Sequence, residues 1–267
     1  MKKVQRIHDL QEAIQLYKKQ GLSIGFVPTM GFLHEGHMAL VQKCKANCDV
    51  CIVSIYVNPS QFNEVSDFEN YPTNFDKDSS LLSENKCDLL WYPTVADVES
   101  IVLNVNYDVQ NRDQELEGQH RAGHFKGVIE VVYRLFKAVQ PDLAFFGEKD
   151  FQQYKVIQAM VESNKFKTNV LPVPTKREID GLAMSSRNVR LAKNERKIAP
   201  ELFTVLNSIA RKKKLDNNAL NQAKKSLTER GFEVEYLTPH EFSDGEQRIY
   251  AAVRLGNVRL IDNVAID

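Results

Sequence analysis

The stretch LSIGFVPTMGFLHEGHMALV (residues 22–41) decides the fold, because it joins a short apolar run to a helical pattern through a turn that contains Gly31 and Gly36. Residues 22–28 have the length of a buried strand, and the helical pattern runs from about residue 36 to 47. His34 and His37 stand at the start of that helix, in a chain with six histidines. By itself the pair is compatible with metal ligands, the base of a nucleophile, phosphate contacts or polar residues at a helix end.

The alternation of strand and helix continues along the first part of the chain. Apolar runs typical of strands occupy residues 50–57, 87–93, 141–147 and 167–174, and helical spacing occupies residues 74–85, 127–140 and 150–164. Short apolar strands that alternate with amphipathic helices predict an α/β fold: a Rossmann-like parallel sheet covered by helices on both faces.

The character of the sequence changes after about residue 175. Charged helical patterns at 193–213 and 216–230 are followed by strand-like runs at 232–238, 248–255 and 258–264. We therefore expect a Rossmann-like catalytic domain over residues 1–175 and a smaller α+β domain over residues 176–267, which closes over the site.

Composition limits the class of protein. The 267 residues are 43% apolar, and 35 basic residues balance 35 acidic ones, which disfavours a nucleic-acid surface. The start lacks the apolar core of a signal peptide, and no apolar run approaches the roughly 20 residues of a membrane helix. We expect a cytoplasmic protein with neither membrane nor nucleic acid as partner. The four cysteines lack paired C-x-x-C spacing, so buried thiols are favoured over a metal site.

Polar segments follow three of the predicted strands. TMGFLHEGH follows the first, NPSQF follows residues 50–57, and EKDFQQ follows residues 141–147. In open parallel sheets, ligands bind outside the carboxyl ends of the strands, where the strand order reverses. These three segments therefore predict an active site at one edge of the sheet.

The first of these segments favours an anion. The sequence contains neither G-x-G-x-x-G nor a P-loop, but a helix that begins near Gly36 directs free N–H groups toward the strand ends. At such a terminus the imidazoles of His34 and His37 are favoured in the neutral form, which still donates one hydrogen bond. A purely structural, capping role for His37 remains open at this point.

Other segments add cations, hydroxyls and neutral amides. Lys149 is suited to a phosphate and Asp150 to a ribose hydroxyl or a metal-bound water, with Gln153 one turn further along the helix. The segment DGLAMSSRN (residues 180–188) offers serine hydroxyls and the planar fork of an arginine, although one serine could simply cap a helix. EGQHRAGHFKG (residues 117–127) adds His120, Arg121 and His124 before a long helix. Asn58 and Gln61 offer amides that bind hydroxyls and carboxylates without adding charge.

The order of these segments resembles the pantothenate synthetase (pantoate–β-alanine ligase) family of the nucleotidylyltransferase superfamily, whose hallmark is an H-x-G-H signature. The similarity runs from about residue 28 to 263 and rests on an ordered series: PTMGFLHEGHMALV, SIYVNPSQF, NYP, HRAGHFKGV, LFKAVQPDLAFFGEKDFQQ, DGLAMSSRN, RKIAP and RLIDN. It implies a ligase that forms an amide bond between (R)-pantoate and β-alanine at the expense of ATP, by way of pantoyl adenylate, with pyrophosphate and AMP as by-products. It also implies Mg²⁺ on the ATP phosphates, with protein ligands unknown, and a homodimer.

The resemblance also assigns roles to individual residues. It implies catalytic roles for His34, His37, Lys149 and Arg187. The implied ATP-binding residues are Met30, Gly31, His34, Gly36, His37, Gly147, Glu148, Lys149, Asp150, Lys176, Met184, Ser185, Ser186 and Arg187. The implied ligands of pantoate and β-alanine are Met30, Asn58, Gln61 and Gln153. Departures from the family pattern are Thr73, Ala122, Arg190 and the short segment 94–109.

Three functions remain to be separated on the sequence. They are a ligase that forms an acyl adenylate, a transferase of the same superfamily that moves a nucleotide onto a phosphate, and a regulatory module that only binds a nucleotide. The neutral amides Gln61 and Gln153 favour the ligase, because a phosphate acceptor would require more cations. The combination of His37, Lys149 and Arg187 disfavours the binding module, which need not stabilise a reacting phosphate.

Overall fold

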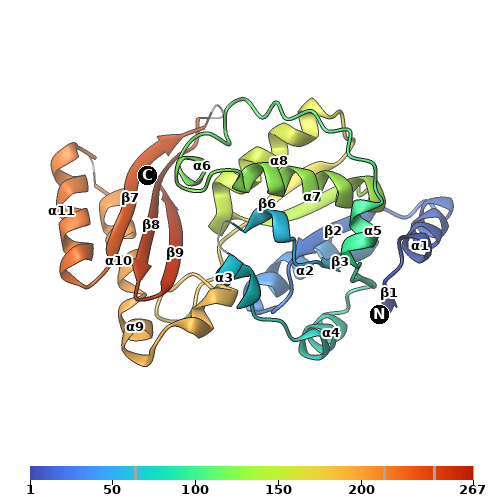
Figure 1. The fold of residues 1–267 in the computed structure, drawn as a ribbon, viewed down its shortest axis with the longest axis horizontal. Coiled ribbons are helices and arrows are strands. Elements are labelled where there is room, and N and C mark those ends of the chain that lie inside the picture. Colours follow the sequence, from blue (N-terminus) through green and yellow to red (C-terminus); the bar gives the residue numbers. More distant parts are fainter. Residues whose placement is uncertain (63–64, 213–214, 243–244, 267) are drawn as a thin grey trace. The chain divides into compact units, whose positions relative to one another are not determined.

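A computed structural model describes residues 1–62, 65–212, 215–242 and 245–266 of the chain. The chain divides into two compact units (Figure 1). The first comprises Met1–Glu148 and Gln152–Pro174, and the second comprises Lys149–Phe151 and Thr175–Asp267. Lys149–Phe151 thus group with the carboxyl-terminal part of the chain, although a strand of the first unit ends at Gly147, two positions before Lys149.

The first unit contains a six-stranded sheet in the order β1-β4-β3-β2-β5-β6, in which every pair of neighbouring strands is parallel. Chain order reverses between β2 and β5, where β3 lies on one side of β2 and β5 on the other. This is the switch point at which ligands bind in such sheets. The strands are β1 (Lys2–Val4), β2 (Ile24–Thr29), β3 (Val50–Ile55), β4 (Leu89–Trp91), β5 (Leu143–Gly147) and β6 (Asn169–Val173).

Helices cover both faces of this sheet. One face packs against α2 (Glu35–Asn47) through residues such as Val27 and Val53, whereas their neighbours along the strands face the other way. On that second face, Phe26 of β2 meets Phe136 of α7 (His124–Val139) with ring centroids 6.1 Å apart. Both strands are therefore apolar at consecutive positions, which is the pattern of a sheet buried on both sides. The remaining helices of this unit are α1 (Ile7–Lys19), α3 (Val65–Glu69), α4 (Phe75–Glu84), α5 (Val95–Glu99), α6 (Glu117–His120) and α8 (Phe151–Ser163), with the 3₁₀ helix η1 (Pro59–Gln61). Lys149 and Asp150 of the 3₁₀ helix η2 (Glu148–Asp150) group with the second unit.

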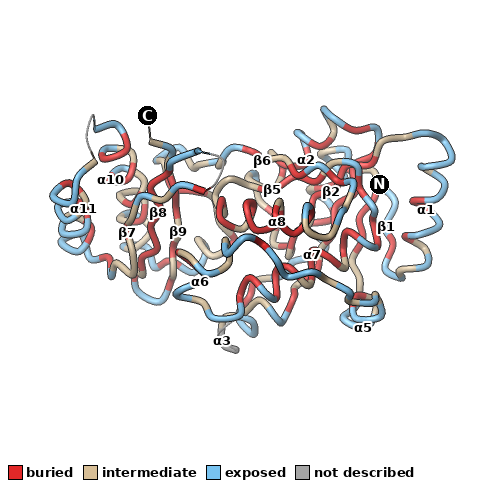
Figure 2. Tube along the Cα trace, turned by 90° about the horizontal axis from the view of Figure 1, so that it is seen from above, coloured by how far each residue is buried: buried red, intermediate tan, exposed pale blue. Residues whose placement is uncertain are grey.

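Figure 2 shows how far each described residue of the chain is buried. Buried residues follow α7, α8 and the strands beside them, whereas α5 and α11 (Asn217–Glu229) are mostly exposed. Among the helices in the described part of the chain, none has both the length and the apolar character that crossing a membrane requires.

The four cysteines belong to the core of the first unit. Cys44, Cys48, Cys51 and Cys87 are all buried, free thiols in the cluster between α2 and the sheet. A thiol–thiol hydrogen bond with Cys44 and burial raise the pKa of Cys51, and burial raises the pKa of Cys48. Buried, protonated thiols are inert fillers of the core, in agreement with the interpretation of these cysteines from the sequence.

The second unit is α+β. Its three strands, β7 (Glu233–Glu241), β8 (Gln247–Leu255) and β9 (Val258–Ala265), form an antiparallel sheet in that order. Alternate residues of β8 and β9 pack against α10 (Glu201–Ala210), and α11 packs beside it. The unit also contains α9 (Lys193–Ile198) and the 3₁₀ helix η3 (Ser186–Arg190).

The predicted fold class is confirmed, and most predicted elements lie within two or three residues of their observed bounds. The single helix predicted over 193–213 is wrong, because α9 ends at Ile198 and α10 begins at Glu201. Pro200 lies in this break. Its nitrogen carries no hydrogen, so it cannot donate the backbone hydrogen bond that would continue the helix. Residue 213, the predicted end of that helix, lies outside the described residues, as do residues 63 and 64 of the predicted loop after β3.

Candidate functional site

The H-x-G-H segment forms the amino-terminal end of α2, directly after β2. The His34 ring caps this helix, because its Nδ1 accepts the Gly36 backbone N–H at 3.1 Å. The Nδ1 of His37 lies 3.3 Å from the backbone N–H of His34, which completes a reciprocal capping box. The two rings are 4.1 Å apart between centroids. Both histidines therefore lie where sequence analysis placed them, at the carboxyl end of the central strand.

These contacts determine which ring nitrogen carries the proton. A nitrogen that accepts a hydrogen bond cannot be protonated, so the neutral ring of each histidine carries its hydrogen on Nε2. The helix end thus combines imidazole N–H donors with the positive end of the helix dipole. Such a combination binds anions.

A buried carboxylate, which sequence analysis did not identify, holds the loop before this helix. Asp78 of α4 is 2% exposed, and its two oxygens accept the backbone N–H groups of Phe32 and Leu33 at 2.7 Å each. Gly31 and Phe32 both have positive φ, +82° and +50°, and a side chain at Gly31 would press against Asp78. Burial raises the pKa of the Asp78 carboxyl, against the opposing effect of the two backbone hydrogen bonds. Asp78 therefore stabilises a strained turn that positions His34.

Asn58 and Gln61 follow β3 on η1. Asn58 is buried and caps η1: its Oδ1 accepts from the Ser60 hydroxyl at 3.0 Å, and its Nδ2 donates to the Gly127 carbonyl at 3.1 Å. The Gln61 amide nitrogen lies 2.6 Å from the sulfur of Met30, which follows β2. The structure thus brings Gln61 and Met30 together, and it uses Asn58 to attach η1 to α7.

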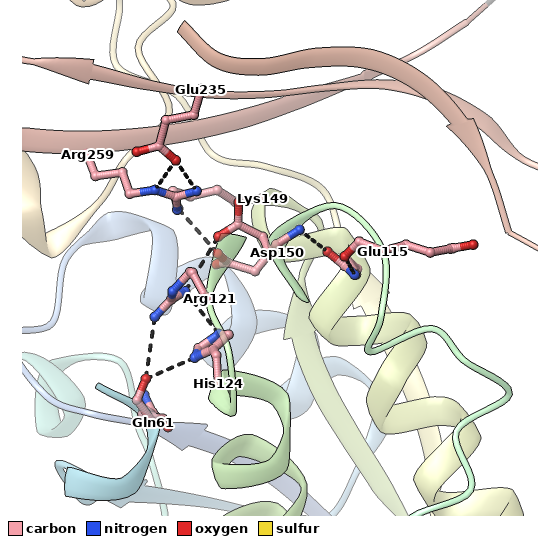
Figure 3. Close-up of polar contacts among 10 residues, drawn as sticks. Gln61, Glu115, Arg121, His124, Lys149, Asp150, Glu235 and Arg259 are labelled. Carbon is pink, nitrogen blue, oxygen red and sulfur yellow. Dashed lines mark hydrogen bonds and ion pairs between the residues drawn. The ribbon is translucent and has the colours of Figure 1, made fainter. Parts of the chain in front are cut away.

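The HRAGH segment also supports this 3₁₀ helix. Figure 3 shows Arg121 and His124 converging on the backbone carbonyl of Gln61, which accepts from His124 Nδ1 at 2.9 Å and from the Arg121 guanidinium at 3.4 Å. Arg121 also donates to His124 Nε2 at 3.0 Å and pairs with Glu117 at 3.5 Å. His124 is buried and has a structural role, whereas His120 is exposed at the end of α6.

The segment after β5 supplies Gly147, Glu148, Lys149, Asp150 and Gln153. Gly147 ends the strand, and an added Cβ there would meet no atom of the described residues within 4 Å. Lys149 and Asp150 belong to η2, with 3.5 Å between the ammonium and the carboxylate. Gln153 lies in the first turn of α8 and is partly exposed.

In the second unit, the segment from Lys176 to Arg187 begins as a hairpin. Arg177 pairs with Ala183, and the Met184 N–H donates to the Lys176 carbonyl at 3.0 Å. Ser185 then caps η3 by accepting the Arg187 N–H at 3.3 Å, as one serine was expected to do, and Ser186 is buried behind it. The hairpin therefore brings Lys176 beside the Met184–Arg187 segment.

Within the described residues, one group of three possible metal ligands has its ligand atoms close together: His8, Asp9 and Glu12. It lies on α1, a helix that carries none of the predicted site residues. The departures Thr73, Ala122 and Arg190 are exposed residues in a loop, in a turn and at the end of η3. None of these three residues takes part in the side-chain caps of α2 and η1, which are made by His34, His37 and Asn58.

The sequence profile described as pantoate–β-alanine ligase matches residues 2–265. The chain belongs to this family. The ligase is 44% identical to the pantothenate synthetase of Bdellovibrio bacteriovorus over 93% of this chain and 94% of that protein. It is 39% identical to the pantothenate synthetase of Alcanivorax borkumensis over 100% of this chain and 98% of that protein.

Solved structures agree with the family assignment. Pantothenate synthetase from Thermus thermophilus superposes with a TM-score of 0.88 and 36% identity, and the match covers 100% of this chain and 99% of that one. The pantoate–β-alanine ligase from Francisella tularensis, in a complex with Beta-gamma ATP and β-alanine, has a TM-score of 0.87 and 33% identity over 99% and 97% of the two chains. The protein is therefore an enzyme of this ligase family, which forms an amide bond. This finding excludes a module that only binds a nucleotide.

Proposed function

We propose that the ligase condenses (R)-pantoate with β-alanine in two steps. In the first, a carboxylate oxygen of pantoate attacks the α-phosphorus of ATP, and the bond from that phosphorus to pyrophosphate breaks. In the second, the amine of β-alanine attacks the acyl carbon of pantoyl adenylate, AMP leaves with the bridging oxygen, and the nitrogen loses a proton. The complex of the Francisella tularensis ligase with Beta-gamma ATP and β-alanine supports these substrates.

The observation that carries this proposal is the pair of imidazoles at the end of α2. With Nδ1 of both rings accepting backbone N–H groups, His34 and His37 keep their protons on Nε2, where they donate to phosphate oxygens. Attack on phosphorus requires positioning and stabilisation of charge rather than a covalent nucleophile, and a neutral donor with a fixed orientation supplies both. Gly31, Gly36 and Met30 shape the backbone around this donor pair.

The amides of the first unit suit pantoate. Gln61 beside Met30, together with Gln153, offers hydrogen bonds to hydroxyls and a carboxylate without a cation that would quench the attacking carboxylate. Asn58 contributes by holding η1, since the structure engages both its oxygen and its nitrogen in internal hydrogen bonds.

Residues of the second unit suit ATP. Lys149 and Arg187 offer positive charge to the phosphates, and Asp150 offers a carboxylate to the ribose hydroxyls. Ser185 and Ser186 add hydroxyls, and Lys176 and Met184 add backbone groups. The proposed set also includes Gly147 and Glu148, which belong to the first unit. The residues fit a Mg²⁺ carried mainly by the phosphates, because the partly exposed carboxylate of Asp150 already lies beside the Lys149 ammonium. Bound there, Mg²⁺ would neutralise charge on the departing pyrophosphate.

The test is exchange of labelled pyrophosphate into ATP in the absence of β-alanine. We expect exchange that requires pantoate and Mg²⁺, and that EDTA abolishes. Absence of pantoate-dependent exchange, with folded protein and Mg²⁺ present, would contradict the adenylate step. Exchange that a phosphorylated acceptor supports in place of pantoate would favour a nucleotide transferase instead. The homodimer that the resemblance implies is a separate proposal, which sedimentation equilibrium would test.

A further inference from the structure

Two adjacent buried polar residues of the RLIDN segment have no part in the function proposed so far. Asp262 and Asn263 lie in β9, and each is 4% exposed. Buried polar groups in the middle of a strand lower stability unless hydrogen bonds compensate them. Their partners therefore show what they contribute.

Asn263 contacts the segment that carries Lys149. Its Nδ2 donates to the backbone carbonyl of Lys149 at 2.9 Å. This contact explains why Lys149–Phe151 group with the second unit, and it is joined by the Arg248 guanidinium of β8, which stacks 4.1 Å from the ring of Phe151. The backbone from which the Lys149 ammonium extends is thus attached to β8 and β9.

Asp262 contacts the other segment of the second unit that is proposed to bind ATP. Its carboxylate accepts two hydrogen bonds from the Arg177 guanidinium, at 2.6 and 2.9 Å. Arg177 also donates to the Gly181 carbonyl at 3.2 Å and stacks on the Phe203 ring, with 3.7 Å from its guanidinium carbon to the ring centroid. Planar guanidinium groups held by two bonds and a stacked ring have a single orientation. The hairpin from Lys176 to Met184 is therefore fixed to β9 through Arg177.

The geometry of a strand explains how two neighbours hold two separate segments. Successive side chains of a strand point to opposite faces of the sheet. Asp262 shares its face with Leu260 and Val264, which pack on the apolar core of this unit, and Asn263 points to the other face. One further bond links the pair, because the Asn263 backbone N–H donates to Asp262 Oδ1 at 2.8 Å.

We propose that Asp262 and Asn263 are positioning residues for ATP: Asn263 places Lys149, and Asp262, through Arg177, places the segment that ends in Ser185, Ser186 and Arg187. This inference rests on the proposed function of those segments. Neither residue is assigned a contact with substrate. Their effect is to set the distance between two groups of phosphate ligands from a single rigid strand, which lowers the cost of ordering them when ATP binds.

The first experiment compares Asn263→Ala with Val258→Ala, a core truncation at the opposite end of β9. Both variants should lower Tm. Only Asn263→Ala should raise the KM for ATP, by about tenfold, the scale of one lost hydrogen bond to a backbone group that must be placed correctly. Its KM for pantoate should stay within about twofold, since the proposed pantoate residues belong to the first unit. Should Asn263→Ala fail to fold, Asn263→Asp keeps the shape and lacks the donor.

The second experiment is a double-mutant cycle on the KM for ATP with Asp262→Asn and Arg177→Met. If Asp262 acts through Arg177, the double variant should show about the same increase as Arg177→Met alone, because Asp262 then has no guanidinium left to hold. Additive increases would overturn the role assigned to Asp262. Equal increases of the KM for ATP in Val258→Ala and Asn263→Ala would overturn the role of Asn263. Pantoate-dependent exchange by the unmodified enzyme serves as the reference, so loss of the proposed function would appear there first.

Discussion

Two histidine segments of this enzyme look alike in sequence and work in opposite ways. HEGH (residues 34–37) and HRAGH (residues 120–124) each end in a histidine at the start of a helix, α2 and α7 respectively. At α2 the histidine rings accept hydrogen bonds on Nδ1 and keep the proton on Nε2. At α7 the ring of His124 accepts on Nε2 and donates from Nδ1. Residue type and helix position are thus insufficient to assign a function to a histidine.

The difference arises from the neighbouring donors. His34 and His37 lie against backbone N–H groups of their own helix end, which contact the nearer ring nitrogen, Nδ1. His124 lies 3.0 Å from a guanidinium nitrogen of Arg121, and a guanidinium can only donate. The Nε2 of His124 must therefore accept, and its proton is left for the Gln61 carbonyl. One segment presents protons to a ligand, and the other uses its proton to hold η1.

The largest expected effect comes from His37. We expect His37→Asn to reduce kcat about 10²- to 10³-fold, the scale for loss of one donor to a transition state, with Tm nearly unchanged. The asparagine oxygen can replace Nδ1 as the acceptor of the His34 N–H, but its amide does not reach the position of Nε2. His37→Ala should lose the same activity and also some stability, because it removes the reciprocal cap. Steady-state kinetics and thermal unfolding measure both quantities, and a near-normal kcat would show that His37 is only a capping residue.

The same substitution at His124 should have little effect, which sharpens the comparison. In His124→Asn the amide nitrogen can take the place of Nδ1 and donate to the Gln61 carbonyl, so we expect kinetic constants within about threefold of the unmodified enzyme. His124→Leu retains volume without a donor, and it should raise the KM for pantoate about tenfold through displacement of Gln61. A large loss of kcat in His124→Asn would contradict a structural role for this residue.

An effect smaller than that at His37 is expected at Asp78, which supports only the first histidine segment. Asp78→Asn replaces one acceptor by an amide group that faces a backbone N–H, so kcat should fall about three- to tenfold as His34 loses its fixed position. Asp76, an exposed residue of the same helix α4, offers a control: Asp76→Asn removes a carboxylate at a solvent-exposed position. An equal loss of kcat in both variants would contradict the role assigned to Asp78.

Asp78 also predicts a dependence of stability on pH. Burial raises the pKa of its carboxyl above the ordinary 3.8, so the folded state binds the proton more tightly than the unfolded state does. The stability that this protonated carboxyl contributes is fully present below pH 3.8 and is lost as the pH rises through the raised pKa. The difference in unfolding free energy between the unmodified enzyme and Asp78→Asn should therefore fall as the pH rises from about 3.5 toward neutrality. Urea unfolding across this range, the span around the ordinary carboxyl pKa, measures that difference.

Much of the fold followed from local patterns. The run at residues 22–28, the polar turn and the helix that follows predicted β2, the loop and α2 within two residues of their observed bounds. The break at Pro200 was missed because the apolar spacing continues across it, whereas the backbone ladder does not. The role of Asp78 in holding the turn could not be predicted locally. In the sequence it is one more polar residue of an amphipathic helix, and nothing nearby shows that its carboxylate is buried. Asp262 and Asn263 were part of a quoted motif, but their partners lie far away in sequence.

The sequence by itself determined which chemical groups this ligase carries and where along the chain each follows a strand. Strand and helix periods depend on neighbours a few residues apart, so they can be read locally, and the family resemblance extends that reading to the reaction. Only the structure decided which nitrogen of each histidine is protonated. The deciding donors, the His34 N–H for His37 and the Arg121 guanidinium for His124, are three residues away, but the folded helix ends set their orientation. The structure also decided that Asn58 caps η1 and that Asp78 holds the turn before α2. Hydrogen bonds between groups distant in sequence depend on distances that the chain acquires only when it is folded.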